Sequence, residues 1–237
     1  MNKIKSLQKE VRDNADKKRV LILKRFFKTG KGEYGEGDMF LGLPVPVSIM
    51  ISKKYVDLGF SDLQKLLNSK IHEERMIVLS ILTKQYAKSD ALKQEKIFKF
   101  YLKNTRHINN WDLVDLSAYK IIGPYLQGKN KDILVKLAKS KSIWEKRIAI
   151  ISTFHYIKQG KAKEALKIAE ALVNDRQDLI QKAVGWMLRE VGKRCGQETE
   201  EKFLRKHYKT MPRTMLRYSI ERFPKDKKNF YMGRSIG

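Results

Sequence analysis

A helical pattern of nine residues returns about every 35 residues in this chain. Blocks of this pattern begin at residues 71, 108, 143, 179 and 212, so successive starts lie 37, 35, 36 and 33 residues apart. Each block follows a shorter helical stretch, such as Asp132–Ser140. A helix pair that recurs at this period hides its apolar face by stacking on its neighbours, which is typical of an α-solenoid. We therefore predict an all-α fold with a curved, stacked arrangement. A helical bundle with accidental periodicity is the alternative.

Helical spacing continues almost to the C-terminus, and alternating Val, Ile and Thr runs, which would indicate strands, are hard to find. We predict a single domain over residues 1–224 and a mobile basic tail over residues 225–237. The cations of that tail are Lys225, Lys227, Lys228 and Arg234. The predicted helices span residues 3–28, 45–56, 61–68, 72–87, 92–104, 111–126, 129–140, 143–159, 161–173, 177–194, 197–208 and 212–222.

A glycine-rich segment at residues 30–42 contains a formal match to G-x-G-x-x-G, from Gly30 to Gly35. That motif holds a dinucleotide when a strand enters it and a helix leaves it. Here a helical pattern precedes it, so we interpret the segment as a long loop between two helices. Its glycine amides, with Lys28 and Lys31, could meet a phosphate, or the loop could pack against the second repeat. The acids Glu36 and Asp38 do not favour a phosphate.

Charge is the strongest compositional signal. Lys and Arg number 51 against 26 acidic residues, for a net charge of +25. Such a surplus favours a polyanionic partner through counterion release, and we predict nucleic acid rather than a membrane surface. Cys195 is the single cysteine, which excludes an internal disulfide. The four histidines lack metal-ligand spacing, no apolar run is long enough to cross a membrane, and no signal peptide precedes the repeats. We expect no metal, no cofactor and a cytoplasmic location.

Superposing the blocks places chemically useful side chains in columns. Trp111 lies one helical turn before Asp115, and Arg147 and Trp186 occupy nearby positions on the next two repeats. Each residue has a structural interpretation, because a helical Trp is commonly core and a helical Arg commonly pairs with an acid of the next repeat. Two aromatic faces, a carboxylate and an arginine in a basic groove nevertheless suit a cationic or stacked base beside phosphate.

The strings Asn110–Asp115, Trp144–Arg147 and Gln181–Glu190 resemble the AlkD family of DNA alkylation repair proteins, which are bacterial alkylpurine DNA glycosylases with HEAT-like repeats. The resemblance covers nearly the whole chain. It also includes the segments 34–42, 71–75 and 211–221. It implies a right-handed superhelix of HEAT-like helix pairs.

The resemblance further implies hydrolysis of the N-glycosidic bond of N3- or N7-alkylated purines in double-stranded DNA, without a metal, a cofactor or an obligate protein partner. Such a base carries a positive charge and leaves readily, so the enzyme stabilises the cationic sugar and positions water. Asp115 would do both, Trp111 and Trp186 would contact sugar and lesion, and Arg147 would hold a phosphate. Further DNA contacts are predicted at the basic residues Arg75, Lys146, Lys182, Arg189, Arg213 and Arg217.

Two other functions stay open. The glycine-rich N-terminal segment resembles another branch of the superfamily, some members of which bind branched or distorted DNA without base excision. A protein-interaction scaffold is the third reading, since solenoids commonly bind proteins. Asp115 favours the glycosylase, because a carboxylate in a phosphate-lined groove would repel DNA in a pure binder. The expected location is the cytoplasm of a bacterium, in association with the nucleoid.

Overall fold

The computed structural model describes residues 3–233. In this range the backbone is helical apart from turns, loops and an isolated bridge between Met39 and Ile71, so the predicted all-α class is confirmed there. The chain divides into two compact units, residues 1–117 and residues 118–237. The boundary falls inside helix α7, Trp111–Tyr125. The predicted single domain over residues 1–224 stays a prediction.

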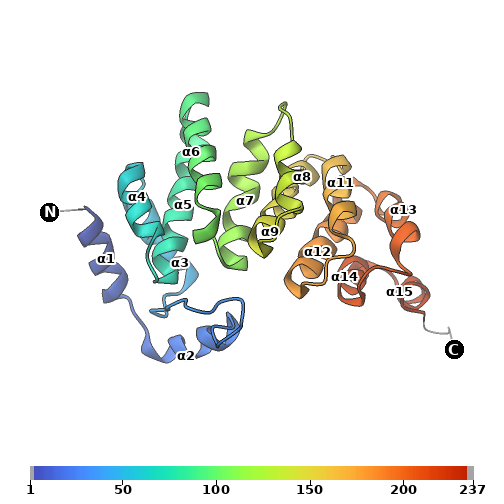
Figure 1. Cartoon of the computed structure of the whole chain (residues 1–237), viewed down its shortest axis with the longest axis horizontal. Coiled ribbons are helices and arrows are strands. Elements are labelled where there is room, and N and C mark those ends of the chain that lie inside the picture. The colour runs from blue at the N-terminus through green and yellow to red at the C-terminus, as the bar shows by residue number, and fades with distance from the viewer. Residues whose placement is uncertain (1–2, 234–237) are drawn as a thin grey trace. The chain divides into compact units, whose positions relative to one another are not determined.

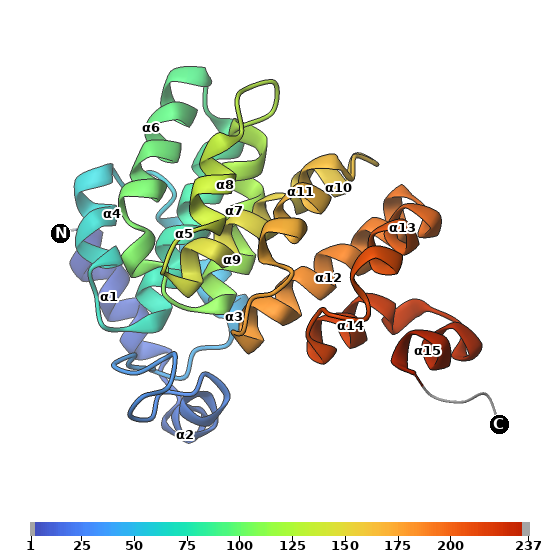
Figure 2. The ribbon, with the colours of Figure 1, turned by 45° about the vertical axis from the view of Figure 1, so that its right-hand side comes forward.

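The N-terminal unit consists of paired helices and one long loop. Helix α5 is its centre, with α3, α4 and α6 packed against it. Figures 1 and 2 both show α2 and the loop after it at one edge of this unit, below α3 and α5. The helices are α1 Lys3–Asp13, α2 Lys17–Phe26, α3 Val45–Lys54, α4 Phe60–Leu67, α5 His72–Lys88, α6 Ala91–Lys103 and the 3-10 turn η1 Thr105–His107.

Burial explains why α5 holds this unit together. Leu63, Leu66 and Leu67 form one apolar face of α4, as three-and-four spacing predicts, and all are fully buried. Helix α5 instead buries residues on every side, its polar first turn included. A helix enclosed in this way needs partners for its buried polar groups. Glu73 and Arg75 find partners in the glycine-rich loop, whereas Glu74 accepts a hydrogen bond from Gln8 of α1.

The predicted helix over residues 3–28 is two helices. The chain leaves α1 after Asp13, and Asp16 starts α2 by accepting a hydrogen bond from the backbone N–H of Lys18. A side chain that satisfies a first-turn N–H is an N-cap, and this local bond competes with a continuous helix. The N–H of Asp16 also donates to the carbonyl oxygen of Leu41 at 2.9 Å. The end of the loop therefore fixes the break.

The glycine-rich segment is a loop, as predicted, and the structure favours packing over phosphate binding. The amides of Gly30 and Gly32 already donate to the carboxylates of Glu33 and Glu36, at 2.7 and 2.8 Å. Gly42 has φ of +90°, and a Cβ there would lie 2.1 Å from the carbonyl oxygen of Asp16. Glycine is required at this position, because the two backbones touch.

The C-terminal unit is built around α12, which packs against α9, α11, α13 and α14. Its α12–α14 contact is the most extensive helix pairing given for the described residues. In Figure 2, α12 and α14 lie side by side. The helices that follow α7 are α8 Asp132–Ala138, α9 Ile143–Ser152, α10 Phe154–Ile157, α11 Lys163–Leu172, α12 Asp178–Cys195, α13 Gln197–His207, α14 Arg213–Ser219, η2 Ile220–Arg222 and α15 Lys225–Met232.

Two helical glycines permit this packing. A Cβ at Gly185 of α12 would lie 2.5 Å from the carbonyl oxygen of Met215 on α14, and a Cβ at Gly123 would lie 2.5 Å from that of Ser152. Glycine costs about 1 kcal/mol of helix propensity. Close approach of helix backbones is the physical reason for both glycines.

The repeat prediction places helices correctly. The five blocks become the first turns of α5, α7, α9, α12 and α14. The prediction of one helix over residues 143–159 is wrong, since α9 ends at Ser152 and the short helix α10 follows Thr153.

The prediction of a mobile basic tail is wrong for residues 225–232, which form α15. Tyr231 is buried, and Lys227 pairs with Glu201 of α13. Pro224 starts this helix with a fixed φ of −56°. Arg234, the last cation of the predicted tail, lies outside the described residues.

Candidate functional site

Trp111 and Asp115 lie one turn apart on α7, as the repeat predicts. The helix begins at Trp111, whose N–H donates to the side-chain oxygen of the buried Asn110 at 2.8 Å. Both side chains are half-buried, so each keeps some surface available to a ligand. Residues four apart share a helix face, and this face joins an aromatic ring to a carboxylate.

An aromatic cluster that the sequence did not predict covers one face of Trp111. Phe27 stacks on the indole with centroids 5.2 Å apart and planes at 18°, and the half-exposed Phe26 meets it edge-on at 5.5 Å. Phe27 also stacks on Phe40 of the loop, at 5.0 Å, and Phe40 on His72, at 4.6 Å. The cluster packs against the indole and restricts its orientation.

Beneath the cluster, a buried charge network ties the loop to α5 and α7. His72 bridges two acids, with Nδ1 3.1 Å from Asp38 and Nε2 2.8 Å from Asp112. Burial opposes a charge on His72, but the charge of Asp112 and the hydrogen bonds to both acids raise the His72 pKa to about 9. Burial likewise opposes the charge of Asp38, yet the bond from His72 and the charge of Arg75 hold its pKa below the ordinary value. His72 and Asp38 are therefore both charged at neutral pH.

Glu73 completes the anchoring of the loop. Its carboxylate accepts backbone hydrogen bonds from Leu41, Gly42 and Leu43, between 2.8 and 3.3 Å. Three donors on one buried carboxylate form a charge-assisted set. The loop thus determines where α2, and with it Phe26 and Phe27, meets the Trp111 ring.

The other two predicted active-site residues belong to the C-terminal unit. Arg147 on α9 is buried, and its Nη1 donates to the carbonyl oxygen of Leu179 at 2.6 Å. Trp186 on α12 is half-buried and meets Phe154 at 5.9 Å, with planes at 45°. Their convergence with Trp111 and Asp115 stays a prediction.

Around Trp186 the C-terminal unit gathers cations that the sequence analysis missed. Lys158 lies 4.6 Å above the ring of Tyr119, and Arg194 lies 5.5 Å above that of Phe154. Burial lowers the pKa of Lys158, and the charges of Lys120 and Arg194 lower it further. Mutual repulsion of this kind marks an electropositive surface that an anion would stabilise. Lys158 directly follows α10, and no local spacing pairs it with Arg194.

The predicted DNA contacts differ in how freely they could reach a phosphate. Arg213 and Arg217 on α14 are exposed. Lys182 is partly exposed and pairs with Asp178 at 2.7 Å. Lys146 forms an ion pair with the side chain of Asp175 at 2.6 Å, and Arg189 forms an ion pair with Glu221.

Arg75 does not fit the predicted role in DNA binding. Only 3% of its surface is exposed, and its guanidinium donates to Asp38 at 2.7 Å and to the carbonyl oxygen of Ser69 at 2.9 Å. Its partner acid comes from the loop, far away in the sequence. Arg75 therefore anchors the loop.

Residues 3–233 offer neither a metal cluster nor a membrane-spanning helix. No three His, Cys, Asp or Glu side chains there are grouped to hold a metal ion. Nor is any described helix both long and apolar enough to cross a membrane.

Comparison with known proteins identifies relatives of this fold. A predicted DNA alkylation repair enzyme from Enterococcus faecalis matches with 14% identity and a TM-score of 0.68, over 90% of this chain and 98% of that one. AlkD2 from Streptococcus mutans matches with 15% identity and a TM-score of 0.55, over 88% and 99%. No curated protein sequence matches. The family model described as DNA alkylation repair enzyme matches residues 7–223, and the chain belongs to this family.

Proposed function

We propose that this protein is a monofunctional DNA glycosylase that excises N3- or N7-alkylated purines from double-stranded DNA. Family membership supports a role in the repair of alkylated DNA. The observation that carries the finer proposal is the pairing of Trp111 with Asp115 on one partly open face of α7. A half-buried aromatic ring one turn from a half-buried carboxylate suits a cationic base and a developing sugar cation.

Asp115 has the central role in this proposal. An alkylated purine leaves as a neutral base, so positive charge passes to the deoxyribose as the bond breaks. A carboxylate stabilises that charge and accepts a proton from the attacking water.

The C-terminal unit would supply phosphate contacts. Lys158, Lys120 and Arg194 beside Trp186 carry much of the positive potential that the proposal needs. Arg213 and Arg217 are exposed and remain proposed backbone contacts. Arg147 is held against the first turn of α12, so its proposed contact with phosphate is combined with a role in positioning that helix.

The experiment is the release of free base from duplex DNA that carries 7-methylguanine. We expect Asp115→Asn to slow release about 100-fold or more, with duplex affinity little changed. Asp132→Asn is the matched control, since Asp132 is an exposed carboxylate at the start of α8. Equal rates for Asp115→Asn and the wild type would contradict the role of Asp115.

The second candidate is a protein that binds distorted or branched DNA without excision. The burial of Arg147 favours it, because a fixed guanidinium is less able to follow a reacting strand. It predicts salt-dependent binding and no release of base from any alkylated duplex by the wild-type protein. Lys158→Gln should weaken duplex binding and lower the salt slope by about one counterion under either function.

A further inference from the structure

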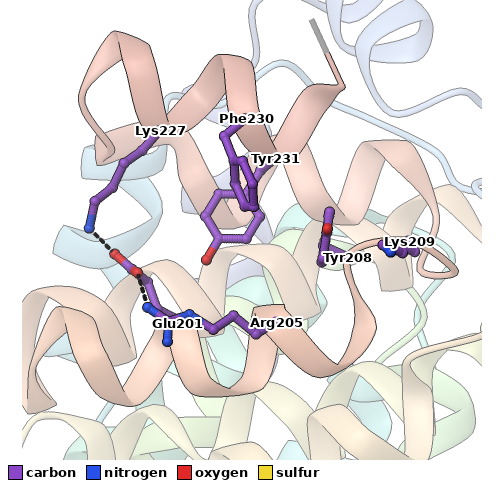
Figure 3. Close-up of a pocket in the computed structure, with 7 residues that line it drawn as sticks. All are labelled: Glu201, Arg205, Tyr208, Lys209, Lys227, Phe230 and Tyr231. Atoms are coloured by element: carbon purple, nitrogen blue, oxygen red, sulfur yellow. Dashed lines mark hydrogen bonds and ion pairs between the residues drawn. The ribbon is translucent and has the colours of Figure 1, made fainter.

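An aromatic pocket lies in the C-terminal unit, between α13 and α15. Its volume is about 500 Å³, and Figure 3 shows the seven residues that line it. Phe230 and Tyr231 come from α15, and Glu201 and Arg205 from α13, with Tyr208 and Lys209 just after α13. None of these residues is among the candidate site residues Trp111, Asp115, Arg147 and Trp186.

The aromatic side of the pocket presents open ring surface. Phe230 stacks on Tyr208 with centroids 5.8 Å apart and planes at 29°, and Tyr231 meets both rings edge-on, at 5.2 and 5.4 Å. Tyr231 is buried, whereas 58% of the Phe230 surface is exposed. An exposed phenylalanine on a rigid aromatic base is a stacking platform.

The charged side of the pocket favours an anion. Glu201 is buried and accepts from Lys227, from Gln197 at 2.9 Å and from Arg205 at 3.4 Å. The hydrogen bond from Lys227 is the main reason why the pKa of Glu201 lies below its ordinary value. This carboxylate is thus neutralised by its own partners, and Arg205, Lys227 and Lys209 leave a surplus of positive charge at the rim.

We propose that this pocket binds an unpaired nucleotide, with its base stacked on Phe230 and its phosphate held by Arg205 and Lys209. A flat ring beside cations matches the two parts of a nucleotide, and stacking accepts any base. A purely apolar ligand would not use the cations, and a second copy of this chain, with its charge of +25, would be repelled. The inference does not depend on base excision, because it concerns binding of unmodified nucleotides.

The test measures how far binding depends on the base. Anisotropy titrations at moderate salt would compare a labelled (dT)8 strand with a strand of equal length and charge that carries abasic sites. Electrostatic binding elsewhere on this basic protein is common to both strands. The ratio of the affinity for (dT)8 to the affinity for the abasic strand therefore isolates stacking. One stacked base contributes about 1–3 kcal/mol, so Phe230→Ala should reduce the ratio by about 5-fold or more. Phe230→Trp should keep it.

Controls separate the pocket from the rest of the molecule. Leu92→Ala removes an exposed apolar side chain of the N-terminal unit and should leave the ratio unchanged. Arg205→Gln should weaken binding of both strands, and more than Arg176→Gln, which removes an exposed arginine outside the pocket. Thermal unfolding of each variant checks that it is folded.

Competition with thymidine monophosphate distinguishes the two sources of a nucleotide. If it displaces (dT)8 from the wild type, with a loss of potency in Phe230→Ala, the pocket takes free nucleotides. If it does not compete, yet the strand ratio still depends on Phe230, the pocket takes nucleotides of a single strand. An unchanged ratio in Phe230→Ala would overturn the proposal, whatever the glycosylase assay gives.

Discussion

Asp38 and Glu73 in the N-terminal unit are buried with donors for their carboxylates, whereas Glu200 in the C-terminal unit is buried with one oxygen unpaired. Asp38 meets His72, Arg75 and Asn110, and Glu73 meets three backbone amides. Glu200, which is 2% exposed, lies against Gly192, and its Oε1 has no hydrogen-bond partner. Asp38 is stabilised as an anion, whereas Glu200 is stabilised as a neutral acid.

The difference shows what each carboxylate does for the fold. Asp38 and Glu73 join a loop to a helix, and an anion gathers backbone and side-chain donors better than a neutral group does. Glu200 packs between α12 and α13, where burial and the charge of Glu201 raise its pKa to about 8. A charged group there would be desolvated without compensation.

The largest expected effect is at Glu73. Glu73→Ala removes the acceptor of three buried backbone amides, and we expect the free energy of unfolding to fall by about 3 kcal/mol or more. The free energy of unfolding of Glu73→Gln should lie between those of Glu73→Ala and the wild type. Urea titration measures both, with the exposed Glu198→Ala as control. A loss no larger than that of the control would show that the loop is not held by this carboxylate.

The next effect is at Glu200. Its pKa is raised in the folded state, so its contribution to stability is full below pH 4.5, the unfolded value, and is lost as the pH rises through about 8. Glu200→Gln should therefore be more stable than the wild type by about 2 kcal/mol at pH 8.5 and similar to it at pH 4. Urea titrations at both pH values provide the measurement. Parallel pH profiles would mean that Glu200 is already ionised in the folded protein.

The contact between Gly192 and Glu200 can also be tested by changing Gly192. A Cβ at this position would lie 1.8 Å from Oε2 of Glu200. Overpacking costs about 1–3 kcal/mol, and the gain in helix propensity offsets about 1 kcal/mol, so Gly192→Ala should destabilise by about 1 kcal/mol. In a Glu200→Ala background the same change should stabilise. Additive effects in the four-protein cycle would show that the two residues do not interact.

The smallest effect concerns His72. Its raised pKa stabilises the fold fully below about pH 6.5 and loses this contribution as the pH rises through about 9. In the Glu200→Gln background, which removes the titration of Glu200, stability should fall by about 1 kcal/mol or more between pH 7 and 9.5. His72→Gln should abolish that slope, and His155→Gln should not. A slope that persists without His72 would assign the pH dependence to another group.

The sequence by itself determined the helices and their repeat. Three-and-four spacing is local, so the first turns of α5, α7, α9, α12 and α14 could be read directly, and with them the shared face of Trp111 and Asp115. It also determined the excess of positive charge. Burial of Leu63, Leu66 and Leu67 follows from the same local pattern.

The tertiary structure decided which of these side chains are available. Arg75 occupies the same position of its block as Arg147, yet Asp38 of the loop holds it inside. Phe27 covers Trp111, and the cations of Lys158 and Arg194 meet beside Trp186, across long separations in sequence. Periodicity describes neighbours along one helix. Contacts between distant segments depend on how the backbones approach, at Gly42 and Gly185 for instance, and no spacing rule encodes that approach.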